Sequence, residues 1–391
     1  MRLAYVLERY PELSQTFVEA ELRELAREGQ PPDVLALQPG DGAELAEPRF
    51  EATYPPRGWR RLAALAGAAA RSPRPAATFV TGRGREAGSA GDLSSRWPPD
   101  GRRMRGLARV ARWRAAAARA DHLHAHFASE AADIAELVGR LTGTPHSFTG
   151  HSTDLFADPA ALRERLAAAA FAVIVCDYDR REVERLAPGA GPLHVVPLGL
   201  DLDAVRRNRP YDPDGPVVAV GRLVEHKGFG DLAAVAADLG REVVIAGEGP
   251  ERAAIERLGG GVVRLTGALA PAAARRLIEG AAVLSAPSVV ASDGSRDGIP
   301  MVVKEALALG VPVVASDAVG NPEVLDPDRG ALHPAGDRAA LADAVRALLA
   351  RPPAEREAMG RAGRAFAERK ADVRAQTAKL RELFEGSNRG Q

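Results

Sequence analysis

The chain has 391 residues, more than one hydrophobic core usually supports, so we expect two domains. Basic and acidic residues both number 52, so the chain as a whole is neutral and gives no indication of a nucleic acid partner. The single cysteine, Cys176, excludes a disulfide framework. The sequence shows neither a signal peptide nor a run of about 18 apolar residues. These features predict a cytoplasmic protein that is at most peripheral to the inner face of a membrane.

The N-terminal part reads as the opening of a parallel α/β sheet. The apolar run 3–10 predicts a strand, helical spacing predicts a helix over 16–29 that stops at Gly29, and 32–39 predicts a second buried strand. The turn before the helix carries Ser14, Gln15 and Thr16. Capping by Ser14 or Thr16 accounts for this turn, and contact with ligand phosphates at the same helix start is compatible with it.

The segment 57–119 does not follow the strand and helix pattern. It holds fifteen arginines against three acidic residues, a net charge of +12, and its stretch 81–101 is expected to be mobile. Apolar residues at a three-residue spacing follow, at Met104, Leu107, Val110 and Trp113. A basic amphipathic helix with tryptophan at its edge suits an anionic membrane surface, and a helix packed on the first domain with solvated arginines is the alternative.

Strand-like runs return at 121–127, 146–151 and 172–176, and five of the eight histidines lie in this region. We therefore expect a first doubly wound domain over 1–196.

Three of these histidines, His122, His124 and His126, alternate and share one face of a strand, as in some metal sites. No acidic ligand is evident near them, so we predict no metal here. His151 ends the next strand, three residues before Asp154, and is the better functional candidate, with a structural histidine as the alternative.

A second series of strands and helices follows the connection at 197–204. Strands are predicted at 216–223, 241–249, 262–269, 282–288 and 311–316. Helices are predicted over 228–239, 250–258, 271–280 and from a start near Pro300. The prediction is a second doubly wound domain over 197–365 and a C-terminal helix over 366–391, for which packing back on the first domain is open.

Two turns in this second series follow strand ends. GRLVEHKGF offers Arg222 and Lys227 beside Gly221 and a second glycine, an arrangement that suits the two phosphates of a nucleotide diphosphate. Solvated loop cations are the alternative. The turn around Glu248 lacks a third glycine, since Arg252 occupies its place, so a plain strand-to-helix turn explains it best.

The stretch SRDGIPMVVKEALALG places Asp297 and Glu305 on either side of a predicted helix start. The free N–H groups at that start can bind an anion, and Gly298 lets the backbone approach a phosphate. Glu305, about a turn and a half into the helix, can reach a ribose hydroxyl pair. Ordinary acidic residues near a helix start are the alternative.

Together these segments resemble the retaining glycosyltransferases of family 4. That family has the GT-B fold of two facing Rossmann-like domains with an interdomain cleft. RDGIPMVVKEALALGVPVV is similar to its acid-x7-acid motif, with Asp297 where most members have Glu. This Asp followed by Gly-Ile-Pro, and the opening YPELSQTF, resemble the exopolysaccharide and colanic-acid branch, although Gln15 departs from the usual Glu. HSFTGHSTDLF resembles the family's His-bearing loop.

The resemblance implies a role for each matching residue. Arg222 and Lys227 would bind the donor diphosphate, Glu305 the ribose, and Asp297 the transferred sugar, whose hydroxyls His151 would approach. These five are the implied catalytic residues. The implied donor-binding set is Gly221, Arg222, Lys227, Glu248, Asp297, Gly298, Ile299, Pro300, Met301, Val302 and Glu305. The implied acceptor and phosphate loop set is Ser14, Gln15, Thr16, His126 and Asp154.

The implied activity is transfer of a sugar from a UDP- or GDP-linked donor, with retention, without a metal and without a further cofactor. The Asp-x-Asp pattern at 200–203 lacks a strand-end context and is discounted as a metal motif. The acceptor would be a lipid-linked glycan or a small-molecule glycoside. A GT-B epimerase or phosphorylase, and a non-catalytic nucleotide-sugar-binding protein, are the alternatives.

Overall fold

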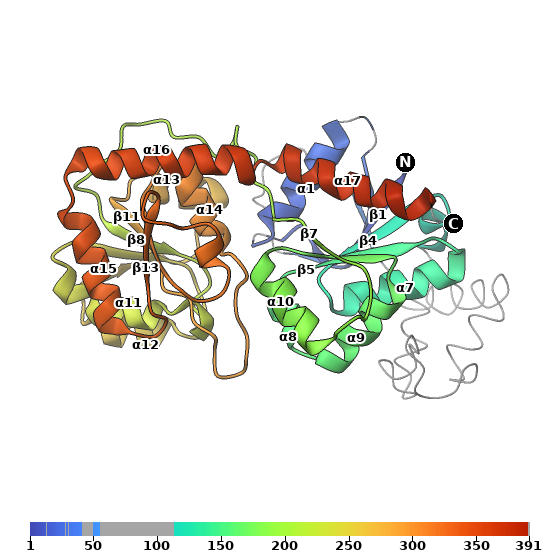
Figure 1. Cartoon of the computed structure of the whole chain (residues 1–391), viewed down its shortest axis with the longest axis horizontal. Helices are drawn as coiled ribbons and strands as arrows, with labels where there is room; N and C mark the ends of the chain where they lie inside the picture. The colour runs from blue at the N-terminus through green and yellow to red at the C-terminus, as the bar shows by residue number, and fades with distance from the viewer. Residues whose placement is uncertain (13, 28, 30, 41–49, 55–112, 390–391) are drawn as a thin grey trace. The chain divides into compact units, whose positions relative to one another are not determined.

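The computed structural model describes residues 1–12, 14–27, 29, 31–40, 50–54 and 113–389 (Figure 1). It forms two units, one of Met1–Val175, Arg180–Val196 and Thr377–Gln391, and a second of Cys176–Asp179 and Pro197–Gln376. Each unit holds a parallel sheet with helices on its faces. The predicted α/β fold with two doubly wound, Rossmann-like domains is confirmed.

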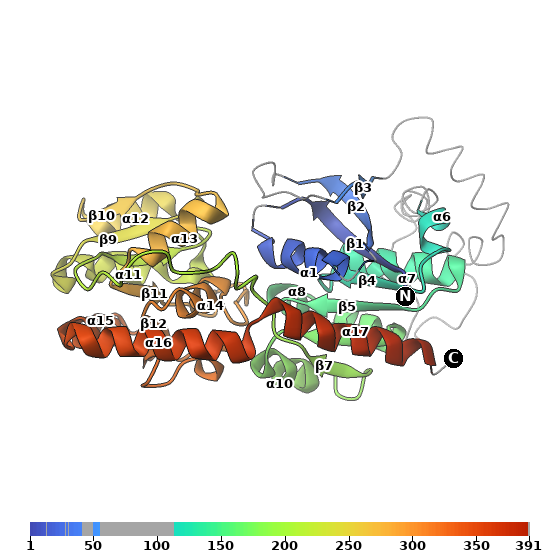
Figure 2. The same ribbon diagram turned by 90° about the horizontal axis from the view of Figure 1, so that it is seen from above.

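The sheet of unit 1 has the order β3-β2-β1-β4-β5-β6-β7, which can be followed in Figure 2. Its strands are β1 Leu3–Tyr10, β2 Asp33–Pro39, β3 Ala52–Thr53, β4 His122–His126, β5 His146–Gly150, β6 Phe171–Ile174 and β7 Leu193–Val195. Its helices are α1 Thr16–Arg27, α6 Arg114–Ala117, α7 Glu130–Thr142, α8 Thr153–Phe156, α9 Pro159–Ala168, α10 Asp177–Leu186, whose first turn belongs to unit 2, and most of α17 Val373–Arg389.

The two faces of this sheet pack against different helices because successive side chains of a strand point to opposite faces. Ala4 and Val6 of β1 belong to the core under α7 and α9, whereas Tyr5 and Leu7 belong to the core under α1 and α17. Phe384 of α17 is fully buried in that second core. The C-terminal helix is therefore an integral layer of unit 1.

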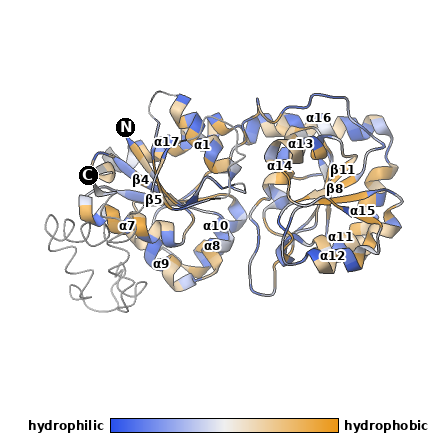
Figure 3. Cartoon of the chain, turned by 180° about the vertical axis from the view of Figure 1, so that it is seen from behind, coloured by the Kyte–Doolittle hydropathy of each residue, from blue (hydrophilic) through white to orange (hydrophobic). Residues whose placement is uncertain are grey.

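The sheet of unit 2 has the order β10-β9-β8-β11-β12-β13. Its strands are β8 Val217–Val220, β9 Val243–Ala246, β10 Val263–Leu265, β11 Val283–Ala286, β12 Val313–Ser316 and β13 Gly330–His333. Its helices are α11 Phe229–Val235, α12 Arg252–Gly259, α13 Pro271–Glu279, α14 Met301–Ala308, α15 Arg338–Ala350 and α16 Pro353–Lys370, with 3-10 turns at Glu225–Lys227, Ala236–Leu239 and Asn321–Glu323. Helices α13, α14 and α16 cover one face and α11, α12 and α15 the other (Figure 1). Figure 3 shows the hydrophobic colour concentrated on the central strands β8 and β11.

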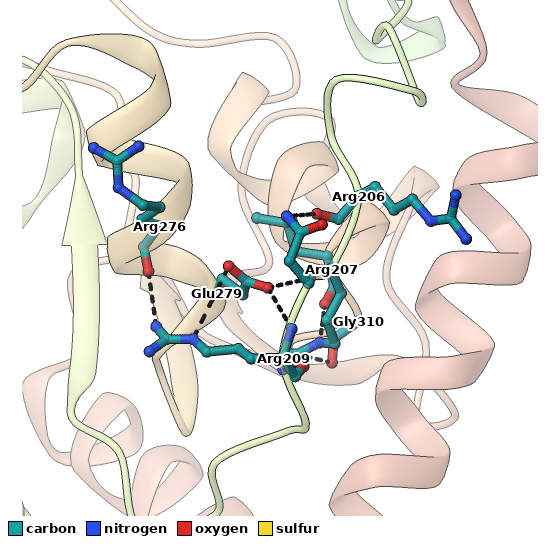
Figure 4. Close-up of polar contacts among 8 residues, drawn as sticks. Arg206, Arg207, Arg209, Arg276, Glu279 and Gly310 are labelled. Carbon is teal, nitrogen blue, oxygen red and sulfur yellow. Dashed lines mark hydrogen bonds and ion pairs between the residues drawn. The ribbon is translucent and has the colours of Figure 1, made fainter.

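Within unit 2, the segment 206–209 is held by an arginine and glutamate cluster (Figure 4). The buried Glu279 carboxylate accepts the backbone N–H groups of Asn208 and Arg209, and the Arg207 guanidinium donates to the Leu309 carbonyl at 2.6 Å. Arg206 directs its guanidinium away from the cluster. These contacts join residues 206–209 to the end of α13 and to the loop after α14.

The expected single helix over 366–391 is wrong in its bounds, because the structure has α16 up to Lys370 and α17 from Val373. Between them, the Ala371 carbonyl accepts the Leu200 N–H at 2.7 Å, and the Val373 N–H donates to the Leu200 carbonyl at 2.9 Å. These backbone groups pair across the chain and so interrupt the helix. The predicted helix over 228–239 is likewise α-helical only over Phe229–Val235.

Trp113 corrects one expectation for the basic segment. Its side chain is fully buried in the core of unit 1, and its indole Nε1 donates to the Thr53 carbonyl at 3.0 Å. It therefore cannot stand at the edge of a membrane-facing helix. The rest of the predicted amphipathic stretch and the stretch 81–101, for which the sequence predicts mobility, lie outside the described residues. Of the helices that the structure describes, none has the length and apolar character needed to span a bilayer.

Candidate functional site

The first candidate site lies in unit 2, where the strand order reverses. Strands β8 and β11 are neighbours, and the chain continues from β8 to one side of the sheet and from β11 to the other. In open α/β sheets, ligands bind outside the carboxyl ends of the strands at such a point. The loops that leave these two ends are 221–228 and 287–300, which hold most of the predicted donor-binding residues.

An ion pair joins the two loops. The Nζ of Lys227 lies 2.8 Å and 2.9 Å from the two carboxylate oxygens of Asp297, and both side chains are 17% exposed. Ser288 donates to the same carboxylate at 3.3 Å, and Nε2 of the buried His226 lies 3.8 Å from it. Burial lowers the pKa of His226, so its ring stays neutral beside the pair.

Glycines allow these loops to pack closely. Gly228 has a φ of +66°. A Cβ on it would lie 1.8 Å from the carbonyl oxygen of Pro287, the first residue of the second loop. A Cβ on Gly247 would lie 1.8 Å from the carbonyl oxygen of Gly221. Neither separation is possible for a real side chain, so both positions require glycine.

Arg222 and Glu248 lie at the rim of this region. Arg222 is exposed, and its guanidinium makes no hydrogen bond or ion pair with the residues that the structure describes. It is therefore a cation available to a ligand. Glu248 is exposed and accepts from Arg252 at 2.7 Å, which favours the plain turn as the explanation of its position.

Helix α14 begins at Met301, directly after Pro300, as the sequence predicts. The buried Gly298 uses its carbonyl to accept the Gly320 N–H at 2.8 Å, which fixes the loop before the helix. Ile299 is buried, whereas Met301 and the next residue, Val302, are partly exposed at the helix start. The N–H groups of the first turn are thus held at the carboxyl edge of the sheet, where an anion can bind them.

Glu305 lies one turn into α14 and is partly exposed. Burial of its carboxyl group raises the pKa to about 7, against an opposing effect of Arg275. A carboxyl group with this pKa changes its charge near neutral pH. Its neighbour Lys304 is buried and donates to the Leu198 carbonyl at 3.0 Å, so it serves the packing of the helix.

A second candidate site lies in unit 1, at the carboxyl ends of β4 and β5. His126 ends β4 and His151 directly follows β5, and His126 Nδ1 lies 2.9 Å from His151 Nε2. The His151 ring contacts those of Phe17 and Phe127, with centroids 4.8 Å and 4.5 Å away. His126 is fully buried, and His151 is partly exposed.

Asp154 joins the loops that carry this histidine pair. Its two carboxylate oxygens accept the backbone N–H groups of His151 at 2.8 Å and Ala128 at 2.6 Å. Burial raises the pKa of Asp154 to about 6, although these bonds and Arg165 lower it. These contacts indicate that Asp154 holds together the two loops that follow β4 and β5.

His122 and His124 have structural surroundings. His122 Nε2 lies 2.7 Å from Ser147 Oγ, and the two ring nitrogens of His124 lie 2.8 Å and 2.9 Å from Ser147 Oγ and Thr149 Oγ1. Burial, with a smaller effect of His146, lowers the pKa of His122 to about 3, and burial lowers the pKa of His124 well below its usual range. Both rings are therefore neutral.

The expectation that no acidic group lies near these histidines is wrong. Glu21 of α1 places a carboxylate oxygen 3.3 Å from His126 Nε2, and ligand atoms of Glu21, His124 and His126 lie within 4.8 Å of one another. Glu21 is separated from His126 by 105 residues. The amphipathic pattern of α1 gives no local signal that this side chain meets a histidine.

The turn before α1 is described except for Leu13. Ser14 is exposed, and Gln15 rather than Ser14 or Thr16 directly precedes the helix, with its carbonyl accepting the Val18 N–H at 3.0 Å. Two further residues of the unit 2 site, His226 and Ser288, have no role in the sequence predictions. His226 meets Asp297 through the folding of two distant loops, whereas Ser288 lies in the same loop as Asp297, nine residues before it.

The chain is similar to several known proteins. Residues 215–351 match the family model "Glycosyl transferases group 1". The alpha-maltose-1-phosphate synthase of Mycolicibacterium smegmatis is 32% identical over 297 residues, which cover 64% of this chain and 74% of that protein. A putative colanic acid biosynthesis glycosyltransferase, WcaL of Escherichia coli, is 31% identical over 39% of this chain and 40% of its own length.

The solved structure of HepE from Anabaena in complex with UDP has a TM-score of 0.72 and 16% identity, covering 99% of this chain and 100% of that one, which supports the fold. Four curated glycosyltransferases, of amylovoran, teichuronic acid, colanic acid and phosphatidylinositol mannoside synthesis, are matched over only 34–60% of their own length. The alignment to the maltose-1-phosphate synthase, together with the family model, shows the family of this chain. The chain belongs to the group 1 glycosyltransferases.

Proposed function

We propose that the chain transfers a sugar from a nucleotide-diphosphate sugar to a hydroxyl acceptor, with retention of configuration and without a metal ion. The observation that carries the proposal is the set of groups at the switch point of unit 2. There Lys227 and Asp297 lie in contact, Arg222 offers a second cation, and the start of α14 offers backbone N–H groups. These groups suit a diphosphate that carries a sugar on one side.

The proposed reaction needs no general base from the protein. The bond between the anomeric carbon and the diphosphate oxygen breaks, and the acceptor oxygen bonds to that carbon on the same face. The departing phosphate oxygen takes the acceptor proton. Lys227 and Arg222 stabilise the charge that develops on the leaving diphosphate, Asp297 binds the sugar, and Glu305 binds the ribose.

His151 is proposed to contact hydroxyls of the transferred sugar, with Ser14, Gln15 and Thr16 in the acceptor and phosphate loop. The names of relatives support a glycan acceptor, since several act in the synthesis of polysaccharides or lipid-linked mannosides. They also support either donor, because one relative is GDP-mannose-dependent and HepE was solved with UDP.

A nucleotide panel tests the donor, with unfolding temperature as the readout. A ligand that binds only the folded state at 100 times its Kd stabilises it by about 2.7 kcal/mol, so UDP, GDP and their sugars can be ranked. A lack of any shift with all nucleotides contradicts the proposal.

Product analysis with the best donor then tests the reaction. Sugar transfer that persists in EDTA is expected, and complete loss that Mg²⁺ restores contradicts metal independence. An epimerised sugar or a sugar phosphate as the product contradicts transfer.

A further inference from the structure

Three side chains from separate elements of unit 1 form a continuous row of contacts. Glu21 Oε1 lies 3.3 Å from His126 Nε2, and His126 Nδ1 lies 2.9 Å from His151 Nε2. The Tyr5 hydroxyl donates to the same Glu21 oxygen at 2.5 Å. The row therefore begins at a carboxylate held by a tyrosine and ends at the histidine proposed to contact the sugar.

With His126 neutral, as the proposal takes it, the contacts of these groups set the positions of the protons. A carboxylate oxygen only accepts hydrogen bonds, so His126 Nε2 carries the hydrogen that faces Glu21. A neutral His126 then has its lone pair on Nδ1, and His151 must donate to it from Nε2. His151 is thus held as the tautomer with its proton on Nε2 and its lone pair on Nδ1.

The backbone around the two histidines is strained in matching places. Phe127, directly after His126, has φ of +77°, and Ser152, directly after His151, has φ of +79°. Left-handed conformations cost free energy in residues other than glycine and concentrate where a fold must aim particular side chains. Asp154 holds both loops through their backbone N–H groups. The fold therefore maintains the geometry of the His126 and His151 pair at a cost in conformational free energy.

We propose that Glu21 and His126 are positioning residues that fix the tautomer and the orientation of the His151 ring at the carboxyl end of β5. The role at the sugar rests on the proposed function. The tautomer assignment takes His126 as neutral and otherwise stands on the contacts in unit 1. A metal ion held by Glu21, His124 and His126 is the competing explanation of the cluster, although both nitrogens of His124 already meet hydroxyl groups.

The experiment compares Glu21→Leu, which removes the accepting oxygen, with Glu21→Gln, which keeps one. The matched control is Glu19→Gln on the same helix, since Glu19 accepts from the Tyr10 hydroxyl at 2.6 Å in a similar way and contacts Arg23. Histidine tautomers are read from long-range ¹H–¹⁵N spectra of the full chain. Sugar transfer is measured with the donor that the nucleotide panel selects.

We expect both His126 and His151 to show the Nε2–H tautomer in the wild-type chain and in Glu19→Gln. In Glu21→Leu, His151 should become a mixture of tautomers, and kcat should fall about tenfold with little change in the donor KM, the equivalent of one hydrogen bond. In Glu21→Gln, kcat should fall only about threefold, since the amide oxygen still accepts the hydrogen bond from His126.

An unchanged His151 spectrum in Glu21→Leu, with the chain folded, overturns the proposal. So does one equivalent of zinc in the purified wild-type chain that is absent from Glu21→Leu, because the cluster is then a metal site. A tautomer change in Glu21→Leu combined with a wild-type chain that transfers no sugar supports the positioning role and contradicts the proposed function.

Discussion

Lys227 and Asp297 place opposite charges in contact at the point where a diphosphate is proposed to bind. A diphosphate that binds the Lys227 ammonium must share it with the Asp297 carboxylate. Removal of Lys227 alone therefore has two effects, since it deletes a charge-assisted contact and leaves a carboxylate that repels the ligand. Arg222, which has no such partner among the described residues, lacks the second effect.

We therefore predict that Lys227→Ala weakens binding of the preferred nucleoside diphosphate about a hundredfold and Arg222→Ala about tenfold. The double variant Lys227→Ala with Asp297→Asn should regain about tenfold in affinity over Lys227→Ala, because the repulsion is gone. It should regain no sugar transfer, since Asp297 is proposed to bind the sugar. Calorimetric titration measures the affinities, and a double variant that binds no better than Lys227→Ala refutes the coupling.

Glu305 predicts a pH dependence of donor binding. Its pKa is raised to about 7 by burial, so the carboxyl group is largely protonated at pH 6 and largely ionised at pH 8. The ionised form accepts two ribose hydroxyls, so affinity for a nucleotide sugar should rise up to about tenfold between these pH values. The diphosphate of a nucleotide sugar is esterified at both ends and does not titrate in this range. Glu305→Gln should show a flat profile, and an equal rise in that variant contradicts the assignment.

The raised pKa of Glu305 also makes the free energy of unfolding depend on pH, in the direction opposite to donor binding. The folded-state pKa of Glu305 lies above its ordinary value of 4.5, so the folded chain binds a proton more tightly than the unfolded chain. Its contribution to stability is therefore largest below pH 4.5 and declines as the pH rises to about 7. The residue thus gives up stability at neutral pH, where its charge is proposed to serve ribose binding.

The loop 221–228 depends on the glycine that ends it. Gly228→Ala combines a left-handed φ of +66° with a Cβ that would lie 1.8 Å from the Pro287 carbonyl oxygen. Gly240 has a similar φ of +61° and nothing within 4 Å of the added Cβ, so Gly240→Ala isolates the backbone cost. We expect about 1–2 kcal/mol of destabilisation for Gly240→Ala and a clearly larger loss for Gly228→Ala.

Urea unfolding, followed by the midpoint and slope, measures both variants. Gly228→Ala should also weaken nucleotide binding, because the clash displaces the loop that carries Lys227, whereas Gly240→Ala should not. Equal destabilisation by the two substitutions shows that the contact with Pro287 is relieved without cost and contradicts the tight loop packing.

Sequence patterns predict most of the described strands because each of those is a short apolar run between turn residues, but they give no prediction for β3, β7 and β13. They also place Lys227 and Asp297 at neighbouring strand ends, although 70 residues separate them, since parallel strands bring their carboxyl ends to one edge. The break between α16 and α17 has no such signal. It arises from backbone pairing of Leu200 with residues 371–373, a contact that local propensity does not contain.

Glu21 illustrates the same limit within the candidate site. Helix α1 packs Val18, Leu22 and Leu25 into the core, and its periodicity predicts that face. The direction of a partly exposed glutamate at the edge of that face depends on where β4 ends, far away in the sequence. The histidines could be singled out by their clustering, whereas their partner could not.

Charge is distributed unevenly over the neutral chain. The segment 57–119 carries +12, so the remaining residues together carry −12. A segment with this charge is attracted to a surface of negative charge. Although Trp113 is buried and residues 55–112 lie outside the described part, the charge argument rests on the sequence alone.

We predict that the full chain binds vesicles that contain phosphatidylglycerol and releases them as salt rises. Each arginine near an anionic surface contributes about 1 kcal/mol at low ionic strength, and screening shortens the range to about 8 Å at physiological salt. Replacing Arg102, Arg103, Arg105 and Arg109 with Gln should weaken co-sedimentation at least tenfold. The control replaces four exposed arginines of unit 2, Arg206, Arg257, Arg361 and Arg369, which changes the net charge equally. An equal loss in both variants means that net charge alone drives binding, and no binding at low salt ends the membrane hypothesis and favours a small, dissolved acceptor.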